Sequence, residues 1–207
     1  MNHLAHLLLS EPDPDAVVGN LMGDFVRGPV EQLESPALRR GVRLHRRIDS
    51  YADAHPVMRR SRRRLSRPYR RYAPILLDVF YDHLLTRHWN RYVSIPLRQF
   101  SARVYLLLER RRHLMPERMQ RYVWYMREYD TLYAYRRRAG IERTLSGLSR
   151  RMRRGNPLAE SAGELFRLQG DLEADFLEFF PQLRAFVTGV TGTPPHQFGR
   201  VVLRPPG

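Results

Sequence analysis

The stretch Pro74–Trp89, PILLDVFYDHLLTRHW, decides the fold class of this 207-residue chain. Its apolar residues form two arcs on a helical wheel: Ile75, Leu76, Val79 and Phe80 on one side, and Leu77, Leu84, Leu85 and Trp89 on the other. A helix that is apolar nearly all round is buried. The sequence therefore predicts a central helix that other helices surround.

The rest of the chain repeats its apolar residues every three to four positions, which favours an all-α protein. We expect helices over about 15–27, 37–52, 56–67, 74–92, 96–113, from 116 onward, 140–154 and 158–180. The helix from 116 is the longest candidate and places Met119, Tyr122, Val123, Met126 and Tyr133 on one stripe. Pro181 is expected to bend or end the last helix before a continuation to about 187. We predict one compact multi-helix domain over 1–187 and a disordered tail rich in Gly, Thr and Pro over 188–207.

The composition limits the chemistry and the cell compartment. The chain has no cysteine, which excludes disulfides and thiolate catalysis and favours a cytoplasmic protein. The opening MNHLAHLLLS has no basic region or cleavage site of a signal peptide, and its apolar run is too short to span a membrane.

The charge is strongly positive, with 36 basic against 21 acidic residues and a net charge of +15. Every basic residue is Arg, and the lack of Lys is first explained by genome-wide codon bias. The net excess still favours a polyanionic partner: nucleic acid, an anionic membrane surface or an acidic protein.

The buried helix carries three residues that could perform chemistry. Asp78 and Asp82 share a face, and His83 lies among apolar neighbours. Burying carboxylates costs several kcal/mol unless a metal or an Arg compensates them. An internal Arg–Asp network is one interpretation, and a metal site is the other.

Two further segments favour the metal site. In GVRLHRRIDSYAD, His45 and Asp49 border the core stripe one helical turn apart, and in GNLMGDF, Asn20 and Asp24 do the same. His6 could reach a central site from the N-terminus. Imidazole and carboxylate ligands together favour Mn, Fe, Co or Zn over calcium.

Four motifs together resemble the acyl carrier protein phosphodiesterase family. They are MNHLAHLLLS at 1–10, GNLMGDFVRG at 19–28, GVRLHRRID at 41–49 and LDVFYDHLLTRHW at 77–89. The resemblance runs from residue 1 to about residue 187. It implies a helical, Mn²⁺-dependent enzyme, distantly allied to the His–Asp phosphohydrolase superfamily. Such an enzyme hydrolyses the phosphodiester between 4′-phosphopantetheine and a serine of holo-acyl carrier protein.

The resemblance also implies roles for individual residues. Predicted metal ligands are Asp24, His45, Asp82 and His83, and predicted catalytic residues are His6, Asn20, Asp49 and Asp78. Of these, Asp49 and Asp78 would orient the imidazoles or transfer protons. In the His–Asp superfamily the adjacent pair reads His-Asp, whereas here Asp82 precedes His83, and the other ligand candidates lie upstream of the pair. Arg46 or Arg47 would hold the non-reacting phosphate oxygens.

The partner implied by the resemblance is the acidic acyl carrier protein, and we expect neither nucleic acid nor a membrane as partner. The densest basic run includes Arg60, Arg63 and Arg64, which we predict to dock the carrier. Its alternative interpretation is a solvated helix face. Two other functions stay open from the residues: a metal-dependent phosphohydrolase of nucleotides or small phosphodiesters, and an Arg-rich helical binder of nucleic acid.

Overall fold

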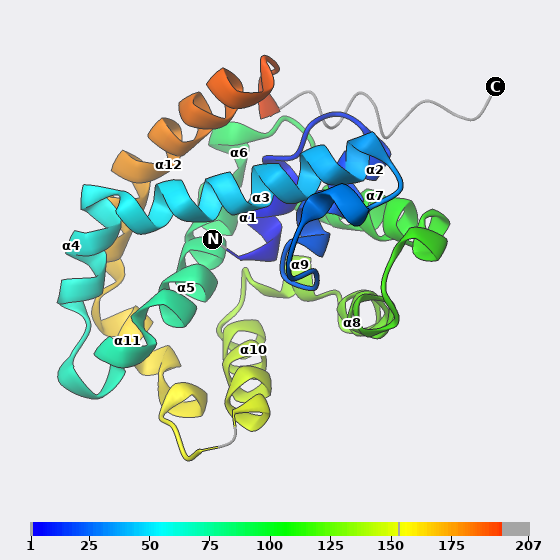
Figure 1. Ribbon diagram of the computed structural model, residues 1–207. Helices are drawn as coiled ribbons and strands as arrows, with labels where there is room; N and C mark the ends of the chain where they lie inside the picture. The colour runs from blue at the N-terminus through cyan, green and yellow to red at the C-terminus, as the bar shows by residue number, and fades with distance from the viewer. Residues whose placement is uncertain (1, 153, 196–207) are drawn as a thin grey trace.

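The computed structural model describes residues 2–152 and 154–195, and over these ranges the chain is helical without a β-strand. The predicted all-α fold is therefore confirmed. The α-helices, labelled in Figure 1, are α1 His3–Leu8, α2 Pro14–Met22, α3 Pro36–Ala54, α4 Pro56–Arg64, α5 Ala73–Arg87, α6 Trp89–Tyr92, α7 Leu97–Arg110, α8 Glu117–Glu128, α9 Thr131–Ala134, α10 Arg138–Arg151, α11 Ala162–Arg167 and α12 Gln169–Thr191. Short 3₁₀ turns cover Val30–Gln32, Arg67–Tyr72, Arg112–Leu114 and Leu158–Glu160.

Helix α5 is the central helix that its sequence predicts. It packs against α1, α4, α10 and α12 (Figure 1), and its apolar side chains on both arcs are almost all buried. The buried residues of α1 through α12 form one continuous hydrophobic core. The functional residues predicted on α5 therefore lie inside this core or at its edge.

Helices α2 and α3 cross at very close range because glycines lie at the crossing. A Cβ atom at Gly19 would lie 2.3 Å from the Leu38 carbonyl oxygen, and one at Gly41 would lie 2.1 Å from the Ala16 carbonyl oxygen. Neither position can carry a side chain, because the atoms that a Cβ would meet belong to the backbone of the other helix. This contact brings the polar residues of α2 next to those of α3.

The N-terminal helix α1 was not among the predicted helices. Its cap residue Asn2 makes no capping hydrogen bond with its side chain. Asp82 of α5 supplies the cap instead, because its carboxylate accepts hydrogen bonds from the backbone N–H groups of Leu4 and Ala5 at 2.8 and 3.1 Å. A helix stabilised from 78 positions away leaves no local start signal.

The predicted long helix from residue 116 ends early. Asp130 adopts a left-handed backbone conformation with φ of 42°, which stops α8 at Glu128 and starts the short helix α9. Tyr133 therefore lies on α9 and does not extend the apolar stripe of α8.

The C-terminal helix also differs from its prediction. The expected helix 158–180 is divided into a 3₁₀ turn, α11 and α12, and α12 runs through Pro181 to Thr191. The flanking Phe180 and Leu183 are fully buried, and their packing offsets the hydrogen bond that proline cannot donate. Residues 188–191, predicted as tail, are thus helical, and 196–207 lie outside the described residues. No described helix is both long and apolar enough to cross a lipid bilayer.

Candidate metal centre and adjoining pocket

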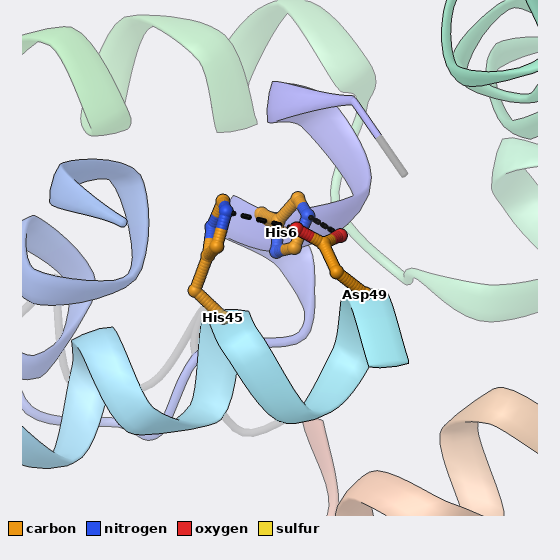
Figure 2. Close-up of side chains that lie close together, drawn as sticks. All are labelled: His6, His45 and Asp49. Atoms are coloured by element: carbon orange, nitrogen blue, oxygen red, sulfur yellow. Dashed lines mark hydrogen bonds and ion pairs between the residues drawn. The ribbon is translucent and has the colours of Figure 1, made fainter. Parts of the chain in front are cut away.

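Three side chains from two helices converge at the edge of the core (Figure 2). His6 comes from α1, and His45 and Asp49 lie one turn apart on α3. The Asp49 carboxylate lies 3.1 Å from His6 Nε2 through one oxygen and 3.1 Å from His45 Nε2 through the other. The three ligand atoms all lie within 4.8 Å of one another. Ligands about 2.1 Å from a shared ion would be separated by about 3–4 Å, so this group can hold a metal ion.

Asn20 of α2 fixes the protonation of the His6 ring. The Asn20 amide donates to the His6 carbonyl oxygen at 2.9 Å and to Ser10 Oγ at 3.0 Å, so its Oδ1 must face His6 Nδ1, 3.1 Å away. Since Oδ1 only accepts, Nδ1 carries a proton, and in the neutral ring Nε2 therefore carries the lone pair. The lone pair of His6 is therefore directed at the Asp49 carboxylate.

The electrostatics of the group are set by burial and by these contacts. Burial and the neighbouring His45 lower the pKa of His6 to about 4, so its imidazole is neutral at pH 7. Burial alone would raise the pKa of Asp49, but contacts with His45 and His6 hold it well below its ordinary value. Burial lowers the pKa of His45, yet contacts with Asp24 and Asp49 outweigh it and raise the pKa to about 9. Without a metal the His45 ring therefore carries a proton at pH 7, which it must release to act as a ligand.

These features fit a bound cation. The neutral His6 ring and the ionised Asp49 carboxylate both present lone pairs, so a nearby positive charge, either the protonated His45 ring or a bound cation, favours their approach. The rings of His6 and His45 stack at 4.0 Å between centroids, which holds both Nε2 atoms toward the same carboxylate. Gly23 makes room for the His45 ring, because a Cβ there would lie 2.2 Å from His45 Cγ.

Asp24 joins this group to a pocket. Its two carboxylate oxygens lie 3.6 Å from His45 Nε2 and 3.1 Å from His3 Nε2. Burial opposes ionisation, but the contacts with His3 and His45 keep the pKa of Asp24 well below its ordinary value. The other nitrogen of His3 lies 3.1 Å from the Tyr122 hydroxyl of α8. Asp24 is thus an ionised carboxylate between the candidate metal group and the pocket wall.

The pocket has a volume of about 1000 Å³. Asp24, His3 and Asp78 line it together with apolar side chains of α5, α7, α8 and α10. Burial raises the pKa of Asp78, so this carboxyl group holds its proton to a higher pH than an exposed aspartate. The pocket therefore offers one ionised and one more readily protonated carboxyl group.

The structure does not bring Asp82 and His83 into the group. Both oxygens of Asp82 accept amide hydrogen bonds from α1, and burial raises its pKa to about 7 against the effect of those amides. His83 Nδ1 donates to the carbonyl oxygen of Tyr135, at the end of α9, at 2.8 Å. Asp82 thus anchors the helix that carries His6, and the role of metal ligand for Asp82 and His83 stays a prediction.

The predicted substrate-binding arginines lie away from the pocket lining. Arg46 donates to the Val26 and Gly28 carbonyl oxygens, and the Arg47 guanidinium lies 5.9 Å from the centre of the Phe186 ring. Two arginines of the predicted docking patch on α4 form ion pairs: Arg60 with Asp175 and Glu178, and Arg64 with Asp171 and Asp175. Arg63 is exposed. Their roles in substrate binding stay predictions.

His6 was predicted to reach the site, but His3 and Tyr122 were not predicted as site residues. His3 and His6 are three positions apart, which places them on one face of a helix, but without a predicted α1 that spacing had no context. Tyr122 was predicted only as part of an apolar stripe, and no local signal marked its contact with His3.

Comparison with known proteins gives a consistent assignment. A model of the acyl carrier protein phosphodiesterase family matches residues 1–183. The chain is 35% identical over 184 residues to an acyl carrier protein phosphodiesterase of Photorhabdus laumondii subsp. laumondii, covering 88% of this chain and 93% of that protein. It is 36% identical over 184 residues to one of Serratia proteamaculans, covering 88% and 95%, and 35% identical over 187 residues to one of Escherichia coli O6:H1, covering 88% and 95%. No solved structure matches the chain significantly, so its likeness to the His–Asp phosphohydrolases stays a prediction.

Proposed function

The chain belongs to the acyl carrier protein phosphodiesterase family, and on this premise we propose that it hydrolyses holo-acyl carrier protein to apo-carrier and 4′-phosphopantetheine. In this reaction a water oxygen forms a bond to phosphorus, and the bond from phosphorus to the serine oxygen breaks. The serine oxygen then takes up a proton. Neither a nucleotide phosphohydrolase nor a nucleic-acid binder is favoured by the family assignment.

The observation that carries the proposal is the convergence of His6 Nε2, His45 Nε2 and the Asp49 carboxylate, whose ligand atoms all lie within 4.8 Å of one another. His6, His45 and Asp49 would hold a divalent ion, with Asp24 beside them. Such an ion supplies a Lewis acid for the phosphoryl charge and lowers the pKa of water. The donor set suits Mn, Fe, Co and Zn, and we propose Mn²⁺ from the family resemblance.

The chain's own residues then have distinct tasks. Asn20 holds His6 with its Nε2 lone pair toward the ion site, as outer hydrogen bonds do for ligating histidines. Asp24 faces both the ion site and the pocket, so its ionised carboxylate is suited to orient the attacking water or to complete the ligand set. Asp78 lines the pocket with a raised pKa, which suits it to donate the proton to the leaving serine oxygen.

The test is conversion of holo-carrier by the purified protein with Mn²⁺, followed by intact-protein mass spectrometry. We expect loss of the 4′-phosphopantetheine mass from the carrier, and we expect chelation to stop it. Carrier that keeps its prosthetic group with every divalent metal supplied would contradict the proposal.

Helix α3 offers a matched pair of variants. Asp49→Ala removes the carboxylate that contacts both histidines, whereas Asp53→Ala removes an exposed carboxylate one turn further on, which pairs with Arg62. We expect Asp49→Ala to lose bound metal and turnover together and Asp53→Ala to keep both. Equal activity of the two variants would rule out the site.

A further inference from the structure

The exposed rim of the pocket combines positive charge with one large aromatic side chain. Five arginines line the pocket and are exposed at its edge: Arg112, Arg118, Arg121, Arg127 and Arg151. Trp124 of α8 lines the same edge and is 63% exposed. The inner wall of this pocket carries Asp24 and Asp78, so the rim surrounds the entrance to the proposed reaction site.

We infer that this rim is the surface on which an acidic protein, the acyl carrier protein of the proposed function, docks. Arg pairs bidentately with carboxylates, and Trp and Arg are the residues most enriched at the energetic centres of protein interfaces. A carrier whose acidic face lies on the rim would place its modified serine at the pocket entrance. The inference rests on the proposed function for the identity of the partner.

The rim arginines are freer to pair with a partner protein than Arg60 and Arg64 of the predicted patch on α4. Within the described ranges Arg118 and Arg151 form no ion pair, and Arg121 and Arg127 pair only with exposed glutamates. Exposed pairs are worth at most about 1 kcal/mol and exchange partners readily. By contrast, Arg60 and Arg64 of α4 both bind Asp175, which is 1% exposed and belongs to the packing of α12. Arg60 and Arg64 therefore stabilise the fold, whereas the rim arginines are left to attract a partner.

The test compares two charge reversals of equal size. Arg118→Glu with Arg121→Glu changes the rim, and Arg59→Glu with Arg63→Glu changes exposed arginines of α4, so net charge falls equally in both variants. Binding of apo-carrier, which has no phosphodiester, is measured by calorimetry at low salt. We expect roughly tenfold or greater weakening for the rim variant and little change for the α4 variant. Trp124→Ala, which keeps the net charge, should also weaken binding.

Turnover gives a second measurement. The rim variant should raise KM for holo-carrier with little change in kcat, and the fall of kcat/KM with added salt should be flatter than in the wild type. The binding assay separates the two proposals: a wild type that binds apo-carrier through the rim but never releases 4′-phosphopantetheine contradicts only the proposed function. A rim variant that binds and turns over like the wild type contradicts only the docking surface.

Two other outcomes would also overturn the inference. Equal weakening in the rim and α4 variants would mean that net charge alone governs binding. Tighter rim-dependent binding of a single-stranded RNA than of apo-carrier at the same salt would assign the surface to nucleic acid. Circular dichroism and thermal unfolding of each variant verify that it is folded, which we expect because all four substituted arginines are exposed.

Discussion

Asn20 donates from its amide to the His6 carbonyl oxygen and accepts from the His6 ring, so one side chain of α2 fixes both the backbone and the tautomer of a residue on α1. Asn20 is fully buried and also donates to Ser10. The position of the His6 lone pair thus depends on a residue outside the group of His6, His45 and Asp49.

Asn20→Ala is expected to weaken metal binding without removing a ligand. The His6 Nδ1 proton loses its acceptor, and the ring becomes free to present either nitrogen. Loss of such an outer partner typically costs 10–100-fold in metal affinity or activity. Metal titration by calorimetry measures this, and at saturating metal the variant should regain part of its turnover. Unchanged affinity would show that packing alone orients His6.

Gly23→Ala is expected to displace the His45 ring. The added Cβ would lie 2.2 Å from His45 Cγ, and Gly23 has an ordinary right-handed backbone, so the clash is the only cost. We expect a loss of about 1–3 kcal/mol in the free energy of unfolding, as for other overpacked sites, together with loss of turnover.

The control for Gly23→Ala is Gly147→Ala in α10, where the new methyl group meets nothing within 4 Å. That variant should be as stable as the wild type or slightly more stable. A double variant, Gly23→Ala with His45→Ala, tests the cause directly, because the clash needs both side chains. If Gly23→Ala costs as much without the His45 ring, the proposed clash is not the cause.

The sequence predicted the elements whose signals are local. The apolar arcs of α5 and the one-turn spacing of His45 and Asp49 on α3 follow from helical periodicity, and both hold in the structure. The helix α1 could not be predicted in this way, because Asp82 of α5 supplies its cap. Because α1 was not predicted, the contact between His6 and Asp49 could not be predicted either.

The hydrogen bonds of Asp82 illustrate the other limit of sequence reasoning, although its predicted role as a metal ligand stays a prediction. The charge of a buried carboxylate needs a compensating partner, and the sequence suggests a metal ion or an Arg for this role. Here the two backbone amides of Leu4 and Ala5 provide part of it, and every residue type but proline carries such an amide, so no sequence pattern could mark them. The same reasoning applies to Arg60 and Arg64, whose partner Asp175 lies more than 100 positions away.

Asp175 is expected to contribute stability that depends on pH. It is 1% exposed and accepts hydrogen bonds from Arg60 at 2.7 Å, Arg64 at 2.8 Å and Ser61 at 2.7 Å. Burial opposes its ionisation, but these donors hold its pKa below the ordinary value. A carboxyl group with a depressed folded-state pKa stabilises the fold above its unfolded pKa of about 4 and loses that contribution as pH falls further.

Asp175→Asn should therefore cost about 3 kcal/mol at pH 7 and less near pH 3, since the unfolded wild type takes up a proton below its pKa of about 4 and is thereby favoured. Urea unfolding of both proteins between pH 3 and pH 7 gives the difference in their unfolding free energies. Titrating groups that the two proteins share contribute equally to both and cancel in this difference. The matched control is Glu178→Gln, because Glu178 pairs with Arg60 but is 50% exposed and should contribute at most about 1 kcal/mol. A cost for Asp175→Asn that does not change with pH would contradict the assigned charge state.

The last prediction separates an anchoring role for Asp82 from a role as metal ligand. Asp82→Ala leaves the amides of Leu4 and Ala5 buried without acceptors, and each such group costs about 1–3 kcal/mol. We therefore expect a large loss in the unfolding free energy of the metal-free protein. The variant should still bind one ion per chain at saturating metal. Its affinity should be lower, because α1 positions the ligand His6 and is held less firmly without Asp82.

The ligand variant Asp49→Ala should show the reverse pattern. Asp49 is 41% exposed, so its loss, which removes the contacts with His6 and His45, should lower the unfolding free energy of the metal-free protein less than Asp82→Ala does, while bound metal is lost. Unfolding in chelator and metal content by mass spectrometry, measured on both variants, form a two-by-two comparison. If Asp82→Ala instead keeps the stability of the metal-free protein and loses its metal, Asp82 acts as a ligand and α1 is held by its apolar packing. If both measurements fall as predicted, the carboxylate of α5 acts on the site only by holding α1, and through it His6, against α3.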